Sequence, residues 1–124
     1  MIKVLLIDDE EDFCELVKAN LEETGEFEVI TATDPEQGLI LAKRELPNII
    51  LLDIVMPGMD GSILAGRLKE DPLTANIPVI FLTAIVSRSE IGPEGREISG
   101  RYFFAKPVDT QALVKYIKKI LSKS

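Results

Sequence analysis

Residues 49–53 read Ile-Ile-Leu-Leu-Asp, a continuous apolar run that stops at a carboxylate. An apolar run without polar alternation is typical of a parallel strand that is covered on both faces. Asp60 and Gly61 follow after a short loop and indicate the start of a helix. The segment therefore predicts a buried strand over residues 49–52, an acidic loop and a helix, which is the repeating unit of an α/β fold.

The same unit recurs along the chain. Four other apolar runs have the length of a strand, and they cover residues 3–7, 27–32, 79–83 and 102–105. Segments with helical periodicity separate most of these runs. Asp34, Pro35 and Gln37 indicate an N-cap, a first-turn proline and a reciprocal capping residue. Asp109 indicates the N-cap of the last helix, and Gly25 is expected just beyond the end of the first one.

Five βα units joined by right-handed crossovers fold into a parallel sheet with helices on both faces. We therefore expect a doubly wound, five-stranded parallel sheet with the flavodoxin-like strand order 2-1-3-4-5. The fourth helix is expected to be irregular, because residues 87–100 contain Gly92, Pro93, Gly95 and Gly100. A loop over residues 90–95 and at most a short helix over residues 93–99 are predicted there.

The composition limits the class of protein. A length of 124 residues with 46% hydrophobic and 28% charged residues predicts a single folded domain over residues 1–124. The formal net charge of −7 disfavours direct nucleic-acid binding, which needs a basic face. No apolar run approaches the roughly 20 residues of a membrane span, and no export signal is recognisable. Together with the single cysteine, Cys14, these features predict a cytoplasmic protein without membrane contact.

The chain contains no histidine. This absence excludes histidine phosphocarriers, Ser-His-Asp hydrolases and histidine-ligated zinc or iron. A bound metal ion must therefore be a hard cation with oxygen ligands. A nucleophile must be a carboxylate, a hydroxyl group, a lysine or the lone thiol.

Side chains able to do chemistry stand where the predicted strands end. In chain order they are Asp8, Asp9, Asp53, Thr83 and Lys106. In open α/β sheets, ligands bind outside the carboxyl ends of the strands where the strand order reverses, here between the first and third strands. Convergent carboxylates repel one another unless a cation lies between them, which favours Mg²⁺. A phosphoryl group on Asp53 would then meet a metal ion, an ammonium group and a hydroxyl group together.

Each of these residues also has an ordinary structural interpretation. Asp8 and Asp9 alone would suit an N-capping loop, and a single Asp53 would suit a turn. Thr83 alone is a common residue at the end of a strand, and Lys106 alone would suit a solvated loop. The placement of all of them at the ends of four predicted strands favours a functional site over coincidence.

Four segments together resemble the receiver domain of bacterial response regulators. They are VLLIDDE at residues 4–10, ILLDIVMPGMDG at 50–61, PVIFLTA at 78–84 and FAKP at 104–107. The resemblance extends from residue 3 to about residue 121, and its stretch over residues 53–61 is highly specific. It implies a role in two-component signal transduction, in which Asp53 accepts a phosphoryl group from a phosphohistidine of a sensor histidine kinase or phosphotransfer protein.

The resemblance also implies roles for the neighbouring residues. The ligands of Mg²⁺ would be Asp8, Asp9, Asp53 and the backbone carbonyl of Val55. The groups in contact with the phosphoryl group would belong to Thr83, Ala84 and Lys106. Thr83 and the aromatic Phe103 would change position after phosphorylation, and the Lys106–Pro107 peptide bond would be cis.

The domain would act as a phosphoacceptor rather than a conventional enzyme, as a monomer or weak dimer. It would control a protein partner or an effector domain that lies outside this sequence. Phe103 stands where the family often has tyrosine, and the irregular residues 87–100 predict an output face that is more mobile or differently shaped. The apolar Val55 and Ile85, two residues after Asp53 and Thr83, predict a long-lived phosphoryl state.

Three other interpretations remain open. An aspartyl phosphatase of the haloacid-dehalogenase type would need a second acid where Val55 stands. A flavin-binding module would need a phosphate-cradling glycine-rich loop after the first strand, where acidic residues stand instead. A receiver-like scaffold that is never phosphorylated is disfavoured, because all the expected site residues are present.

Overall fold

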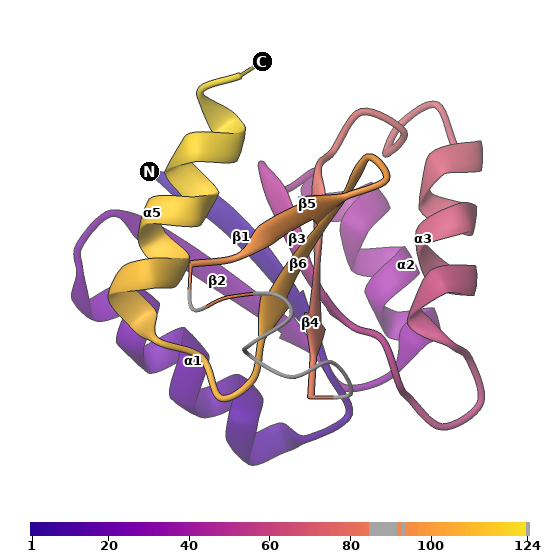
Figure 1. Ribbon diagram of the computed structural model, residues 1–124. Coiled ribbons are helices and arrows are strands. Elements are labelled where there is room, and N and C mark those ends of the chain that lie inside the picture. Colours follow the sequence, from indigo (N-terminus) through magenta and orange to yellow (C-terminus); the bar gives the residue numbers. More distant parts are fainter. Residues whose placement is uncertain (85–91, 93, 124) are drawn as a thin grey trace.

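The computed structural model describes residues 1–84, 92 and 94–123. Within these residues the chain forms a six-stranded sheet and four helices (Figure 1). The strands are β1 (Ile2–Ile7), β2 (Phe27–Ala32), β3 (Ile49–Asp53), β4 (Val79–Thr83), β5 (Arg96–Ile98) and β6 (Arg101–Ala105). The helices are α1 (Glu11–Glu23), α2 (Pro35–Glu45), α3 (Gly61–Glu70) and α5 (Thr110–Leu121). None of these helices is long and apolar enough to cross a membrane.

Five strands are parallel and have the predicted order. The sheet runs β2-β1-β3-β4-β6-β5, so β6 takes the place of the predicted fifth strand. Val4 of β1 pairs in parallel register with Val29 of β2 on one side and with Ile49 of β3 on the other. The order of the strands therefore reverses between β1 and β3, where the sequence placed the ligand site.

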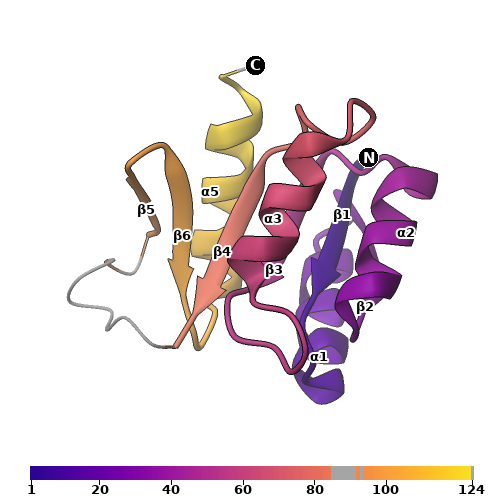
Figure 2. The same ribbon diagram turned by 90° about the vertical axis from the view of Figure 1, so that its right-hand side faces the viewer.

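The sixth strand, β5, was not predicted. It pairs antiparallel with β6 at the edge of the sheet (Figure 2). Ser99 and Gly100 join the two strands with φ angles of 52° and 80°. Two consecutive positive φ angles are the requirement of a type I′ turn, whose twist matches that of the strands it connects. The Ser-Gly pair thus specifies a tight hairpin.

This hairpin corrects the prediction for the fourth helical segment. The short helix expected over residues 93–99 is wrong at residues 96–98, which form β5. Of the loop expected over residues 90–95, Gly92, Glu94 and Gly95 belong to no helix or strand, as predicted. Residues 90, 91 and 93 lie outside the described residues, as do residues 87–89 of the segment for which mobility was predicted.

Helices cover both faces of the sheet. The side chains of β1 alternate between two cores, with Val4 and Leu6 on one side and Leu5 and Ile7 on the other. The first core is closed by α1 and α5, and the second by α2 and α3 (Figures 1 and 2). All four side chains are fully buried, and each contributes about 1.5–3 kcal/mol by leaving water. This explains why the strand is apolar without interruption.

Aspartate side chains cap the N-termini of α2, α3 and α5, as predicted. Asp34 accepts a hydrogen bond from the Gln37 N–H, and Asp109 accepts one from the Ala112 N–H. Asp60 caps α3 by accepting a hydrogen bond from the Ser62 N–H. Gly25 follows α1 with a φ of 80°, which suits a residue without a Cβ atom. The caps keep the loops short, so each strand delivers its last residues to the same edge of the sheet.

Candidate functional site

Three carboxylates converge where the strand order reverses. Asp8 directly follows β1 and Asp53 is the last residue of β3. Asp8 is fully buried and Asp53 is 7% exposed, whereas Asp9 faces solvent. One oxygen from each of the three side chains lies within 4.8 Å of the others. The sequence therefore placed all three acids correctly.

Lys106 extends into this cluster from the loop after β6. Its ammonium nitrogen lies 2.7 Å from Asp8 Oδ2 and 3.6 Å from Asp53 Oδ1. The peptide bond between Lys106 and Pro107 is cis, as the resemblance implied. The Lys106 N–H donates to the Thr83 carbonyl at 3.0 Å, which joins the ends of β4 and β6. The lysine is thus anchored at both its backbone and its side chain.

The site carries more negative than positive charge. Burial raises the pKa of Asp53 to about 6, and repulsion from Asp8 adds to this rise more than Lys106 offsets it. Burial lowers the pKa of Lys106, but the hydrogen bond and charge of Asp8 and the charge of Asp53 outweigh it, so the net pKa is raised. An additional cation would relieve the repulsion among the acids. The oxygen-only donor set fits a hard divalent ion such as Mg²⁺.

The remaining predicted site residues surround a small hollow of about 260 Å³. Its lining consists of Asp9, Glu10, Asp53, Val55, Thr83, Ala84 and Lys106. Thr83 is buried at the end of β4, whereas Val55 stands at the rim with 57% of its surface exposed. The backbone of Val55 hydrogen-bonds Asp53 and favours its ionised form. The structure therefore brings the predicted residues together, with one exception.

The exception is Phe103, which lies away from the acidic cluster. Its side chain is half-buried in the core beneath α2 and α3. There its ring stacks on that of Phe81, with the centroids 5.5 Å apart. The strands β4 and β6 connect the two places, because Thr83 ends β4 and Phe103 lies within β6.

Three contributors to the site were missed in the sequence. Glu10 Oε1 lies 3.6 Å from the ammonium of Lys106, and the ring centroid of Phe13 lies 4.4 Å from it. Gly61 matters for a different reason, because a Cβ atom there would collide with the carbonyl of Asp53 and lie 2.9 Å from Ile54 Cα. The run of acids after β1 hints at Glu10, but the other two contacts depend on the folded geometry.

Cys14 lies close to the site without taking part in it. Its buried thiol donates to the carbonyl of Asp8 at 3.3 Å. Burial, together with the charge of Asp8, raises the pKa of the thiol to about 12. A thiol that stays protonated is a poor nucleophile and a poor metal ligand. Cys14 is therefore a small buried residue of the core closed by α1 and α5.

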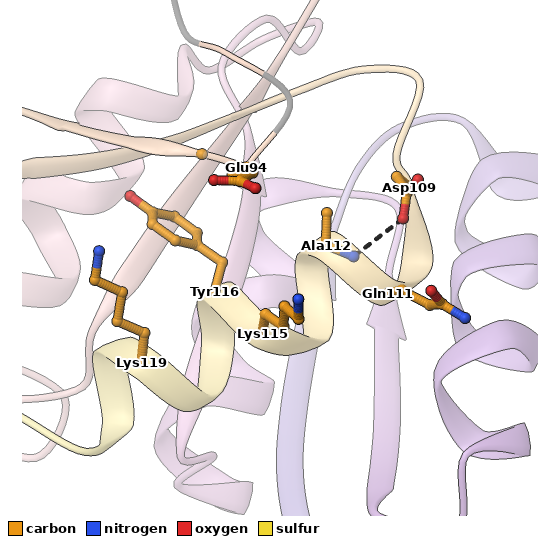
Figure 3. A pocket seen from close by; sticks show the side chains of 8 residues that line it. Glu94, Asp109, Gln111, Ala112, Lys115, Tyr116 and Lys119 are labelled. Atoms are coloured by element: carbon orange, nitrogen blue, oxygen red, sulfur yellow. Dashed lines mark hydrogen bonds between the residues drawn. The ribbon is translucent and has the colours of Figure 1, made fainter.

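A second hollow lies along α5, the last helix. It measures about 460 Å³ and is lined by residues of α5 together with Glu94 and Gly95 (Figure 3). The ring of Tyr116 lies against the backbone of Gly95 at its inner wall. Lys115 and Lys119 of α5 also line it. None of the three clustered acids lies here, so this hollow is separate from the candidate site.

The sheet is mostly parallel and carries acids at the ends of β1 and β3, a hydroxyl at the end of β4 and a lysine after β6, a set of groups suited to accepting a phosphoryl group. The sequence matches the family model of the response regulator receiver domain over residues 4–118. The chain therefore belongs to the response regulator receiver domain family. Its function is that of a phosphoacceptor domain in two-component signal transduction.

Known relatives agree with this assignment. The response regulator PleD of Caulobacter vibrioides is 40% identical over 119 residues, which cover 95% of this chain and 26% of PleD. Protein PilH of Pseudomonas aeruginosa is 34% identical over 98% of this chain and 99% of its own length. The crystal structure of a putative response regulator from Chloroflexus aurantiacus superposes with a TM-score of 0.81, at 32% identity and 98% coverage of both chains. The chain thus spans about a quarter of PleD but nearly all of PilH.

Proposed function

We propose that Asp53 is the phosphoacceptor of this domain. The observation that supports this most strongly is the convergence of three carboxylates and one ammonium group at the reversal of the strand order. A carboxylate oxygen of Asp53 attacks the phosphorus of a phosphohistidine on a sensor histidine kinase or phosphotransfer protein. The new O–P bond forms as the N–P bond breaks, and the histidine leaves with the bonding electron pair.

The other residues stabilise the group that is transferred. We assign Asp8, Asp9, Asp53 and the carbonyl of Val55 as ligands of Mg²⁺, which when bound supplies positive charge for the phosphoryl oxygens. Lys106 provides a second positive charge, and the hydroxyl of Thr83 and the backbone at Ala84 provide hydrogen bonds. The domain takes part in its own phosphorylation in this way, without being a conventional enzyme.

Phosphorylation then changes the surface that a partner reads. Thr83 moves toward the phosphoryl group, and Phe103 responds through β4 and β6. The readout is a downstream protein or an effector domain beyond this sequence, and the domain acts in the cytoplasm as a monomer or weak dimer. Direct contact with nucleic acid or membrane is not part of this proposal, because the chain carries a net charge of −7.

The phosphoryl group on Asp53 is expected to be long-lived. The side chain of Val55 stands beside the site and, being apolar, offers an attacking water no hydrogen-bond partner. Ile85, the other apolar residue in this hypothesis, lies outside the described residues. The variant Val55→Asn is expected to shorten the lifetime of the phosphoryl group severalfold, as followed by intact-mass spectrometry after removal of the phosphodonor. An unchanged lifetime would remove Val55 from this role.

The phosphoacceptor assignment is tested by incubating the purified chain with acetyl phosphate and Mg²⁺. The expected result is a gain of one phosphoryl mass that requires Mg²⁺ and is absent in Asp53→Asn. Titration with beryllofluoride and Mg²⁺, monitored by amide NMR shifts, is expected to perturb the ends of β1, β3, β4 and β6. An Asp53→Asn variant that is labelled as readily as its parent would end the proposal.

A further inference from the structure

The ammonium group of Lys106 lies near the aromatic ring of Phe13 as well as near three carboxylates. Its nitrogen lies 4.4 Å from the ring centroid of Phe13, close enough for a cation–π interaction. The Lys106 side chain is only 13% exposed, so water competes weakly for this contact. The other neighbours are the carboxylates of Asp8, Asp53 and Glu10.

A bound metal ion would weaken some of these attractions to the ammonium group more than others. Asp8 forms the shortest one at 2.7 Å, but Asp8 is also an expected metal ligand. A carboxylate oxygen that is shared with a divalent ion attracts an ammonium group less strongly, and two cations near one carboxylate repel each other. Glu10 is 68% exposed, so solvent screens its attraction. The ring of Phe13 is the one neighbour in this group that no hard cation takes as a ligand.

The position of Phe13 is fixed by the same segment that carries Asp8. The Cys14 N–H donates to the carbonyl of Glu10 at 3.1 Å, and the Cys14 thiol donates to the carbonyl of Asp8. Phe13 also packs against the core that α1 and α5 close. The ring is therefore held in place both by its backbone and by the packing of its side chain.

We propose that Phe13 is a positioning residue for Lys106. Its ring face keeps the ammonium group over the end of β1 and within reach of Asp53 when Asp8 is engaged by a metal ion. This inference rests on the proposed function, because it assigns Phe13 no role apart from that of Lys106. A leucine at position 13 would fill similar space but lacks the ring quadrupole that attracts a cation.

A double-mutant cycle in metal-free protein separates this contact from ordinary packing. Phe13→Leu, Lys106→Met and the double variant are unfolded in urea with EDTA present. The expected result is that Phe13→Leu lowers the unfolding midpoint in the parent background clearly more than in the Lys106→Met background. An equal shift in both backgrounds would show packing alone and would overturn the inference.

Phosphorylation kinetics provide the second readout. With acetyl phosphate and saturating Mg²⁺, Phe13→Leu is expected to be labelled about three- to tenfold more slowly than the parent. Phe13→Tyr, which keeps a cation-binding ring, is expected to recover most of the rate. Equal rates for the leucine variant and the parent, or no recovery with tyrosine, would overturn the inference.

The Lys106→Met variant separates the role inferred for Phe13 from the role proposed for Lys106. If it slows labelling strongly while Phe13→Leu does not, the inference fails and the proposed function stands. If Lys106→Met is labelled like the parent, the role assigned to Lys106 in the proposed function fails, and the inference fails with it.

Discussion

The two ends of β6 are built on different principles. At its C-terminal end, Lys106 enters a cluster of buried charges whose members constrain one another. At its N-terminal end, the hairpin with β5 is held by backbone pairing and one tight turn, and all three side chains of β5 are exposed. The first end contains acids that repel one another and that Lys106 partly neutralises. The second rests mainly on local backbone conformation, with an exposed ion pair between Glu97 and Lys123. Substitutions should therefore affect phosphorylation at one end and only stability at the other.

The largest expected effect on stability comes from Asp53→Asn in metal-free protein. The pKa of Asp53 is about 6 in the folded state against an ordinary value of 3.8, so ionisation of this carboxyl destabilises the fold. The effect is absent below the ordinary pKa, grows up to about pH 6 and is constant above it. At neutral pH, Asp53→Asn should relieve on the order of 2–3 kcal/mol and raise Tm by about 5–10 °C.

Thermal unfolding at several pH values with EDTA measures this difference. The gain in Tm should shrink as the pH falls toward 4, because the parent carboxyl is then protonated in the folded state as well. Added Mg²⁺ should raise the Tm of the parent more than that of Asp53→Asn. A gain that is independent of pH would show that the charge of Asp53 is not its cause.

The hairpin is tested by Gly100→Ala. A residue with a Cβ atom at a φ of 80° is strained, so about 1–2 kcal/mol of unfolding free energy should be lost. Gly66→Ala is the matched control, because Gly66 lies within α3 and a Cβ atom there meets no neighbour within 4 Å. The control should gain about 0.5–1 kcal/mol through helix propensity. Urea unfolding measures both changes, and equal shifts in the same direction would contradict the turn assignment.

Both glycine variants also test whether the two ends of β6 are coupled. Gly100 lies at the far end of β6 from Lys106, and neither glycine lines the acidic hollow. The rate of labelling by acetyl phosphate should therefore stay close to that of the parent in both. A large loss of labelling in Gly100→Ala alone would show that the hairpin and the acidic site are coupled.

The smallest effect is expected for Tyr116→Phe. The Tyr116 hydroxyl is buried and has no hydrogen-bond partner among the described residues. Burial raises its pKa to about 12, and the nearby Phe103 backbone opposes this rise without making a well-aligned hydrogen bond. Removal of the hydroxyl should leave the unfolding free energy unchanged or raise it by up to about 1 kcal/mol. A clear destabilisation in urea would indicate a partner for the hydroxyl.

The sequence predicted the acidic end of β6 better than the hairpin end, and the reason is physical. The C-terminal parts of β1, β3, β4 and β6 are apolar, so the first charged or hydroxyl side chain after each apolar run marks both the end of the strand and a candidate ligand. Asp8, Asp53 and Lys106 were located in this way. The type of each side chain identified it as a candidate ligand, and the order of the strands brought these residues together.

The hairpin was missed because its turn residues were interpreted as parts of a weak helix. Gly95 and Gly100 were interpreted as residues that weaken a helix, since the parallel sheet demands a crossover between β4 and β6. Ser99 and Gly100 between two β-compatible segments are equally a turn signal. The contact of Phe13 with Lys106 had no signal in the sequence, because it joins residues that only the sheet order brings together.

The 2.7 Å contact between Lys106 and Asp8 has a consequence for how a divalent ion enters. Before metal arrives, the ammonium group already serves as a built-in counter-ion for the buried acid. A divalent ion that binds Asp8 would therefore compete with this ammonium group, and its affinity would report only the difference between two attractions to the same carboxylate.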